Sequence, residues 1–343
     1  MTKRALQKAL LCLFCPLLVA MGAEAAEKLP AADAGEIPAN PVGKIAFIRE
    51  GSIWMMNADG ATQEKVSEVV NADGRLTWSP DGKQIVFTRA GMVDLKGPDM
   101  LGGTHKVYDL FMANLDSVYA NNRLWWIRLT TDVGSRDPEW SYNSDTLVFW
   151  KDMEANRVNA VEPNYQPAFM TAENAIVTLI RKDWQRMDEF LISPSRNVNG
   201  QLAAVYFFHQ KAQGLVVLNP DEYMLPEDSL RARALKHPGR VAPAWSPDSK
   251  WIAFVSNNLN DPGLFITNPD QSKTYLVFVP PVGTQLYTFA PSWSPDGKWL
   301  TFSSTDGSVW ISKITGEGAR RLTGPGLDKA PAWSKGPVPG PGN

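Results

Sequence analysis

Residues 290–299 read APSWSPDGKW, and residues 242–251 read APAWSPDSKW. Weaker versions of this phrase recur along the chain, the weakest being FLISPS at 190–195, where Ile192 takes the place of the tryptophan. Six copies are recognised in this way, centred on Trp78, Trp140, Ile192, Trp245, Trp293 and Trp333. A phrase repeated at such intervals indicates an architecture built from similar structural units.

The phrase has the chemistry of a tight turn. In Ser-Pro-Asp-Gly, proline presets the backbone at the first turn position, aspartate bonds to its own backbone, and glycine adopts the positive φ that closes the turn. We therefore interpret the aspartates of the phrase as turn residues and not as metal ligands; they are Asp81, Asp248 and Asp296. The pairs Asp59-Gly60, Asp73-Gly74 and Asp306-Gly307 are likewise interpreted as hairpin or connection signals.

Each copy is followed by β-rich runs that predict strands. In the first full unit these runs are 84–88, 109–113 and 126–130. Four strands in a unit of about 40–60 residues are typical of a propeller blade. The copy at Trp333 has no strands after it, but matching runs occur at 44–48 and 52–57. The sequence therefore predicts an all-β, six-bladed β-propeller, closed by N-terminal strands that pair with the C-terminal innermost strand.

The chain ends differ in composition from the repeats. Lys3, Arg4 and Lys8 precede an apolar run at 9–21 and small residues at 23–25, which predicts a secretory signal peptide over residues 1–25. An uncleaved N-terminal anchor is the alternative. We expect an Ala/Pro-rich linker at 26–42, the propeller at 43–334 and a Pro/Gly tail at 335–343. The cysteines Cys12 and Cys15 both fall in the signal segment, so the mature chain is expected to have neither a disulfide nor a transmembrane segment.

The motif A-P-x-W-S-P-D-G-K-x-I-A-F, followed by a short strand and Leu-Thr, resembles the WD40-like repeat of TolB-type propellers. TolB proper is periplasmic, binds a peptidoglycan-associated lipoprotein at its propeller and carries an α/β domain ahead of it. Here only residues 26–42 separate the signal segment from the propeller, so the resemblance implies a TolB-like propeller without that domain. Similar blades precede the hydrolase domain of prolyl-oligopeptidase-type peptidases, but with the chain ending at Asn343 we expect no such domain.

Two units depart from the common template. The link between the second and third strands is long at 90–107 and at 151–166, and equivalent links of consecutive blades are expected to emerge side by side on one face. The same face receives the connections into the innermost strands. Candidate binding residues on these connections and long loops are Arg136, Asp137, Asp188, Glu189, Arg240, Tyr287, Asp328, Lys329, His105, Asp152 and Glu154. Mixed charges with a tyrosine around a channel mouth suit a peptide or protein, the alternative being solvated loops without a partner.

Other classes of function have less support. The chain has 34 Lys+Arg and 36 Asp+Glu with no basic stripe, which argues against nucleic acid. The histidines His105, His209 and His237 fall in different units without metal-ligand spacing, and no nucleophile or phosphate-binding motif occurs. We therefore expect no catalytic residue, metal or cofactor. Because propeller enzymes assemble a site from one residue per blade, a hydrolase or lyase with a channel site remains an alternative.

A second alternative is a carbohydrate-binding envelope subunit that stacks sugars on Trp125-Trp126, although packing against an adjacent blade is the preferred interpretation. The function that we predict is a non-catalytic protein- or peptide-binding platform of the cell envelope. Its partner would be an envelope protein or peptide, and the resemblance adds a lipoprotein as one candidate. Export follows from the signal segment, and the resemblance implies the periplasm. We expect the protein to be a monomer.

Overall fold

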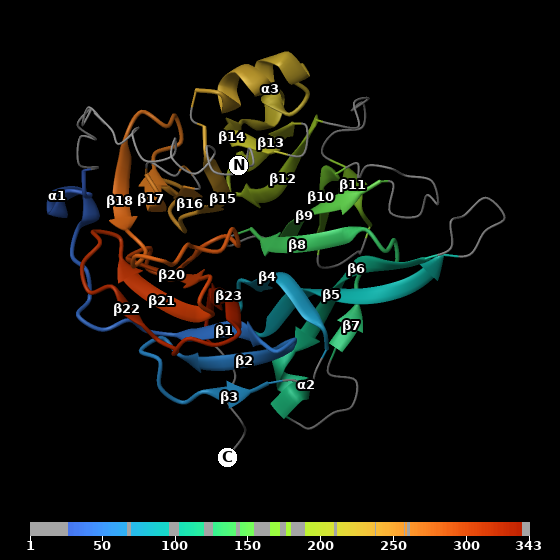
Figure 1. Cartoon of the computed structure of the whole chain (residues 1–343), viewed down its shortest axis with the longest axis horizontal. Helices are drawn as coiled ribbons and strands as arrows, with labels where there is room; N and C mark the ends of the chain where they lie inside the picture. The colour runs from blue at the N-terminus through green and yellow to red at the C-terminus, as the bar shows by residue number, and fades with distance from the viewer. Residues whose placement is uncertain are drawn as a thin grey trace, which may run out of the picture.

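The computed structural model describes residues 27–66, 70–95, 103–119, 126–141, 145–153, 165–171, 176–179, 189–208, 211–236, 238–256, 258 and 261–337. The predicted signal peptide therefore lies outside the described residues. Six antiparallel sheets stand around a central axis like the blades of a propeller (Figure 1). The innermost strands of successive blades are neighbours around this axis. This arrangement confirms the predicted fold.

The blades are numbered from the N-terminus, and their strands are given from the axis outward. Blade 1 consists of β23 (Asp328–Trp333), β1 (Lys44–Arg49), β2 (Ser52–Asn57) and β3 (Glu64–Lys65). Blade 2 consists of β4 (Ala72–Trp78), β5 (Gln84–Leu95), β6 (Gly103–Asn114) and β7 (Trp126–Arg128). Blade 3 consists of β8 (Ser135–Trp140), β9 (Thr146–Asp152), β10 (Tyr165–Thr171) and β11 (Thr178–Leu179).

The second half of the ring continues in the same sense. Blade 4 consists of β12 (Glu189–Arg196), β13 (Leu202–Phe208) and β14 (Lys211–Leu218). Blade 5 consists of β15 (Arg240–Trp245), β16 (Ile252–Ser256), β17 (Gly263–Thr267) and β18 (Thr274–Phe278). Blade 6 consists of β19 (Ser292–Trp293), β20 (Trp299–Ser304), β21 (Ser308–Lys313) and β22 (Arg320–Arg321). The helical segments are α1 (Ala31–Ala34), α2 (Leu115–Tyr119), the 3-10 turn η1 (Pro220–Glu222) and α3 (Glu227–Ala234).

The ring closes where β23 pairs with β1. Ile45 lies opposite Trp333 and Arg49 opposite Asp328 in an antiparallel ladder. The C-terminal strand thus occupies the inner position of a blade whose other strands come from the N-terminus, as predicted. The pairing covers the inner edge of β1, which an open arrangement would expose.

Apolar side chains fill the spaces between neighbouring blades. One buried cluster joins blades 1 and 6 and includes Phe47, Trp299 and Trp333. Another joins blades 1 and 2, and Trp126 packs against it, with its ring centroid 5.1 Å from that of Phe111. A single blade cannot cover its own apolar faces, so stacking supplies the burial that stabilises the disc. Trp126 is therefore a packing residue, whereas Trp125 lies outside the described residues.

The Ala-Pro that opens the phrase forms a β-bulge. The inner strands of blades 1 to 5 each shift register once. At this point Ala242 and Ala330 have φ of 54° and 51°, and a proline follows each of them. A bulge interrupts the ladder, so proline fits there although it has no N–H to donate. The repeated phrase thus specifies a bend in the strand as well as the turn that follows.

The turn itself forms as its residues predict. In blade 2, Ser79 donates to Asp81 at 2.5 Å, and the Gly82 N–H donates to the Ser79 carbonyl at 3.0 Å with φ of 72°. The same Ser-Asp hydrogen bond occurs at Asp248 and Asp296. The tryptophan before each turn donates its indole N–H to the preceding blade: Trp78, Trp245 and Trp293 bond to the carbonyls of Ala332, Ser195 and Ala244.

Blade 4 departs from the predicted alignment. Arg196, and not Ile192, occupies the tryptophan position, because Arg196 pairs with Leu202 as Trp245 pairs with Ile252. The turn is also one residue shorter: the Asn197 N–H bonds to the Gln201 carbonyl, whereas the Ser246 N–H bonds to the Trp251 carbonyl. The proline of Ser193-Pro194 therefore belongs to the bulge and not to the turn.

Blade 4 also has three strands, within the described residues, where the repeat predicts four. The helix α3 packs against β14 and β13 on the outside of the sheet (Figure 1). Along the outer edge of β14, side chains bond two backbone carbonyls: Arg233 donates to Val217 and Gln271 donates to Leu215. These contacts supply hydrogen bonds to backbone carbonyls at an edge that a fourth strand covers in the other blades.

Residues 27–42, which the composition assigns to a linker, pack against the disc. Leu29 and Ala34 are buried in the cluster shared by blades 5 and 6. The Leu276 N–H of β18 bonds to the Glu27 carbonyl at 2.8 Å. At the other end of the segment, the Val42 carbonyl accepts the indole N–H of Trp333 at 2.9 Å. None of the helices in the described part of the chain has the length and apolar composition that crossing a bilayer requires.

Candidate binding face

The face at which the inner strands begin carries both long links, and we call it the mouth face. Much of the link expected at 90–107 is a β-ribbon, because β5 continues to Leu95 and β6 starts at Gly103, and this ribbon projects from the disc (Figure 1). At its base, the Tyr108 N–H bonds to the Val133 carbonyl at 2.9 Å. In the next blade the Asp152 N–H bonds to the Gly134 carbonyl at 2.9 Å. The bases of both links therefore flank the connection into β8.

Charged and aromatic side chains from four blades form a row across this face, which we call the mouth row. Its members are Tyr287, Phe289, Lys329, Asp73, Lys106, Tyr108, Arg136 and Trp150. Tyr287 and Phe289 come from the connection into β19, Lys329 from β23, the next three from blade 2 and the last two from blade 3.

Asp73 lies at the centre of the row between two lysines. Lys329 donates to one carboxylate oxygen at 2.7 Å and Lys106 to the other at 2.8 Å. Burial by itself opposes ionisation of this carboxyl, but the two lysine hydrogen bonds outweigh it and hold the pKa of Asp73 far below its ordinary value. The lysines extend the row in both directions: Lys329 lies 5.7 Å from the centroid of Phe289, and Lys106 lies 5.2 Å from that of Tyr108.

Arg136 continues the row into blade 3. Its guanidinium lies 4.3 Å from the ring centroid of Tyr108 and 4.8 Å from that of Trp150. Cation–π contacts of this kind favour one placement of a guanidinium, and the Arg136 side chain is 20% exposed. Arg136 also donates from Nε to Asp137 at 2.9 Å.

Asp137 is buried beneath the row. Its carboxylate accepts the Arg75 backbone N–H at 2.9 Å and the Trp150 indole N–H at 2.8 Å, in addition to Arg136. Its own backbone N–H donates to Thr88 at 2.9 Å. With these partners Asp137 joins blade 2 to blade 3 and orients Arg136, so its place is structural and beneath the accessible surface.

Asp328 has a similar buried place in blade 1. Arg49 donates to both of its oxygens, from Nε at 2.6 Å and from Nη2 at 2.7 Å. Arg49 in turn lies 4.6 Å from the ring centroid of Trp54. This bidentate pair joins β1 to β23 at the closure of the ring, and it borders a depression lined by Glu50, Gln63 and residues 322–327.

Arg240 does not belong to the mouth row, although the sequence places it there. Its guanidinium bonds to Gln271 at 3.2 Å and to Thr274 at 3.0 Å and lies 4.9 Å from the Phe254 ring centroid. Because Gln271 also donates to the Leu215 carbonyl, the side chain of Arg240 lies near the contact of blades 4 and 5. Burial there lowers the pKa of Arg240 to about 10.

The other sequence-predicted residues are placed only in part. Asp152 is half-buried at the end of β9, beside Lys151, which is ion-paired with Asp132. His105 lies in β6 and Glu189 in β12, but their side chains are outside the described residues. Asp188, Glu154, His209 and His237 lie outside the described residues altogether.

Five members of the mouth row were not among the predicted residues: Asp73, Lys106, Tyr108, Trp150 and Phe289. Asp73-Gly74 was interpreted as a turn signal, but both residues lie inside β4, at its bulge. Lys106 and Tyr108 lie at the end of the long link, where a loop was expected. A signal was present in the alternation of charged and aromatic residues at Lys106 and Tyr108, which extended strand geometry places on one face.

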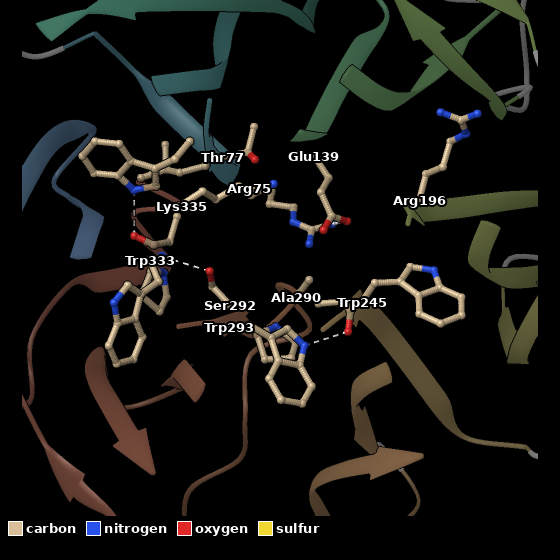
Figure 2. Close-up of a pocket in the computed structure, with 16 residues that line it drawn as sticks. Arg75, Thr77, Glu139, Arg196, Trp245, Ala290, Ser292, Trp293, Trp333 and Lys335 are labelled. Carbon is tan, nitrogen blue, oxygen red and sulfur yellow. Dashed lines mark hydrogen bonds and ion pairs between the residues drawn. The ribbon is translucent and has the colours of Figure 1, made fainter. Parts of the chain in front are cut away.

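A pocket at the opposite end of the channel is lined in part by charged side chains (Figure 2). Arg75 and Glu139 pair at 2.8 Å near its centre, and Lys335 bonds to the Trp140 carbonyl. Burial lowers the pKa of Lys335 to about 8, an effect that Glu139 partly opposes and Arg75 adds to. Trp245, Trp293 and Trp333 point away from the centre of this pocket, as does the guanidinium of Arg196 (Figure 2).

Within the described residues, no group of three or more His, Cys, Asp or Glu side chains is arranged to hold a metal ion. Asp73, Asp328 and Asp137 are instead bonded to lysine, arginine, indole or backbone donors. The lysine and arginine side chains of the row are more exposed than the carboxylates with which they pair.

Comparison with known proteins supports the fold. No family model matches the chain. No curated protein matches it at a significant level. Among solved structures, TolB from Acinetobacter baumannii is 16% identical with a TM-score of 0.61, covering 87% of this chain and 68% of that one. A protein described as TolB from Agrobacterium tumefaciens is 14% identical with a TM-score of 0.56, covering 83% of this chain and 89% of that one. Hydrazine synthase from Kuenenia stuttgartiensis is 13% identical with a TM-score of 0.55, covering 87% of this chain and 48% of that one.

The chain is thus a six-bladed β-propeller whose N-terminal and C-terminal strands share one blade. More particularly, it is a TolB-like propeller in its fold, as the sequence resemblance implies. Sequence identities of this size show a shared fold but do not identify the ligand, because propellers of one shape serve unrelated functions.

Proposed function

We propose that the protein is a non-catalytic platform of the cell envelope that holds a protein or peptide at the mouth of its channel. The observation that carries this proposal is the mouth row, in which side chains from four blades contact one another across one face. Aromatic residues and arginine dominate the energetics of protein interfaces, and both are present in the row.

Preorganisation of the row adds support. Arg136 is held by two rings and Asp137, and Lys329 and Lys106 are held by one carboxylate. Ordered side chains lose little conformational entropy on binding, so their contacts contribute more to affinity. The β5–β6 ribbon rises beside the row, and Met92, opposite Lys106 in the ladder, is 64% exposed there. Met92 thus offers one exposed apolar side chain to a bound chain.

The envelope location is part of the proposal. It is supported by the signal segment predicted at residues 1–25 and by the likeness of the fold to TolB. An exported envelope protein or peptide is the partner class that fits this location. A lipoprotein is one candidate within the class, because of the resemblance of the repeat to that of TolB. We also propose that the platform is a monomer.

Site-specific photo-crosslinking tests the proposal. A photoreactive amino acid is placed at Met92 or Tyr287 on the mouth face, in the full chain and in the cells that make it. The matched control carries it at Lys250, an exposed residue in the turn after Trp245 on the opposite rim. We expect crosslinks to a defined envelope protein from the mouth positions and none to that protein from Lys250.

Cell fractionation in the same experiment tests export. A crosslink of equal yield from both rims, the absence of any crosslink from the mouth face, or recovery of the protein in the cytoplasmic fraction would contradict the proposed function. Turnover of an envelope polysaccharide or peptide by the purified protein would favour the enzyme alternative.

A further inference from the structure

We infer that the mouth row recognises an acidic, extended segment of its partner. This inference rests on the proposed function and adds the chemical class of the ligand. It follows from how the ion pairs of the mouth face are layered, from the rings that support the cations, and from the shape of a row that crosses neighbouring blades.

In five of the ion pairs of this face the cation is more exposed than the carboxylate, whereas in Lys151–Asp132 the two side chains are equally exposed. The exposed fractions of the cationic and acidic side chains are 28% and 4% for Arg49–Asp328, 51% and 21% for Lys106–Asp73, 29% and 21% for Lys329–Asp73, 20% and 12% for Arg136–Asp137, and 44% and 7% for Arg128–Asp109. A ligand therefore meets positive charge first. At the centre of the row Asp73 is shared by two lysines, Lys106 and Lys329.

The buried carboxylates are not accessible to compete with a ligand. Asp137 and Asp328 each accept several hydrogen bonds from neighbouring groups. Other described acids on this face are Glu50, which is exposed and interacts with Arg49, Asp132, which pairs with Lys151, and Asp152, which is half-buried. A carboxylate of the partner would thus reach lysine and arginine groups whose outer sides face solvent, and opposite charges across an interface favour association and orientation.

The aromatic rings determine how these cations are presented. Lys329 lies near Phe289, Lys106 near Tyr108, and Arg136 between Tyr108 and Trp150. The rings hold the basic groups at fixed places and present apolar surface between them. Such a surface suits a chain in which acidic side chains alternate with small apolar ones, because side chains of an extended chain repeat every second residue.

Among the described residues of the opposite rim, the turn pair Lys250–Asp248 differs in that its carboxylate is exposed. There Lys250 and Asp248 are both exposed, 76% and 51%, in a pair at 3.5 Å. Lys83 and Lys250 are turn lysines on that rim and supply a charge-matched control. Exposed pairs of this kind contribute little to binding or stability.

Peptide binding tests the inference. The mature protein, purified from the envelope fraction, is titrated with a fluorescein-labelled peptide of alternating Glu and Ala, about ten residues long and about 33 Å when extended. Matching peptides of Gln-Ala and Lys-Ala, and a thymidine oligonucleotide, are titrated in parallel. We expect the Glu-Ala peptide to bind at least about tenfold more tightly than the Gln-Ala and Lys-Ala peptides at low salt and to weaken as salt screens the charges.

Substitutions assign the binding to the row. Lys106→Ala combined with Lys329→Ala should weaken the Glu-Ala peptide by about tenfold, whereas Lys83→Ala combined with Lys250→Ala should leave its affinity unchanged. Circular dichroism checks that each variant folds. Should the first double variant fail to fold, Lys106→Gln alone, which leaves Asp73 paired with Lys329, is expected to weaken binding by about threefold.

Equal binding of the Glu-Ala and Gln-Ala peptides, or equal losses in the two double variants, would overturn the inference. Equally tight binding of the oligonucleotide would show a surface for polyanions in general, and would overturn it as well. A partner crosslinked from Met92 or Tyr287 without any preference for the Glu-Ala peptide would leave the platform in place and remove only the acidic class of ligand.

Discussion

The carboxylate of Asp137 occupies the space that a side chain at position 74 would need. A Cβ placed on Gly74 would lie 2.2 Å from Oδ1 of Asp137, and the φ of Gly74 is 75°. The same oxygen accepts the Arg75 backbone N–H at 2.9 Å. In blades 5 and 1 the position of Asp137 is taken by Ala242 and Ala330, both at positive φ. Asp137 thus stands where other blades have alanine, and its carboxylate fits because residue 74 of the preceding blade is a glycine.

The change Gly74→Ala should cost about 2–4 kcal/mol of unfolding free energy, about 1–2 of it from the left-handed backbone and the rest from the clash. In an Asp137→Ala background only the backbone part should remain. Urea denaturation of the two single variants and the double variant measures this coupling as a double-mutant cycle. Equal costs of Gly74→Ala in both backgrounds would contradict the proposed steric link.

A segment outside the repeat can also contribute to the packing of the fold, as residues 27–42 show. Leu29 is 3% exposed within a cluster that also contains Val277 and Ile314. The segment joins the outer strand of blade 5 through Glu27 and reaches Trp333 of blade 1 through Val42. It therefore contributes to packing between blades, which composition alone does not reveal.

Leu29→Ala should destabilise the protein by about 2–4 kcal/mol, because a buried leucine loses its apolar contacts and leaves a cavity. Val42→Ala is the matched control, since the Val42 side chain is 66% exposed and only its backbone carbonyl accepts a hydrogen bond. The control should change the unfolding free energy by less than about 0.5 kcal/mol. Thermal and urea unfolding measure both variants. If neither change lowered the unfolding free energy, the segment would be an unpacked linker and the prediction would be wrong.

The whole disc depends on the shared blade at its closure. Removing β23 would uncover the inner edge of β1 and the apolar cluster around Phe47 and Trp299. It would also leave Arg49 without Asp328 and end the contacts of β23 with β4 and β19. Because each blade is stabilised by its neighbours, loss of one inner strand should affect the ring as a whole.

A chain that ends at residue 327 should therefore lose cooperative unfolding and aggregate, whereas a chain that ends at residue 337 keeps every contact described for β23. Size-exclusion chromatography and thermal unfolding followed by circular dichroism compare the two. A monomeric chain 1–327 with a single sharp transition would show that closure is not required for the disc.

The blades were predictable because the signals that form them are local. The Trp-Ser-Pro-Asp-Gly phrase contains its own turn chemistry, and the strand runs beside it alternate as a blade requires. The limit of this reasoning appears in blade 4, where Arg196 replaces the tryptophan and the turn is shorter. The repeat was therefore aligned wrongly on Ser193-Pro194, because nothing in the local sequence distinguishes a proline in a bulge from a proline in a turn.

The sequence by itself determined the six units, the Ser-Pro-Asp turns and the closure of the ring, since each depends on residues that lie close together or on a repeat that can be counted. Tertiary structure alone decided the mouth row. Lys329 and Asp73 are 256 positions apart and meet only because the first and second blades are neighbours around the axis. It also decided that Arg240 turns away from the mouth and that residues 27–42 are packed. Contacts between blades depend on the radial arrangement of the disc, and a charge in the sequence gives no indication of which neighbour that arrangement will supply.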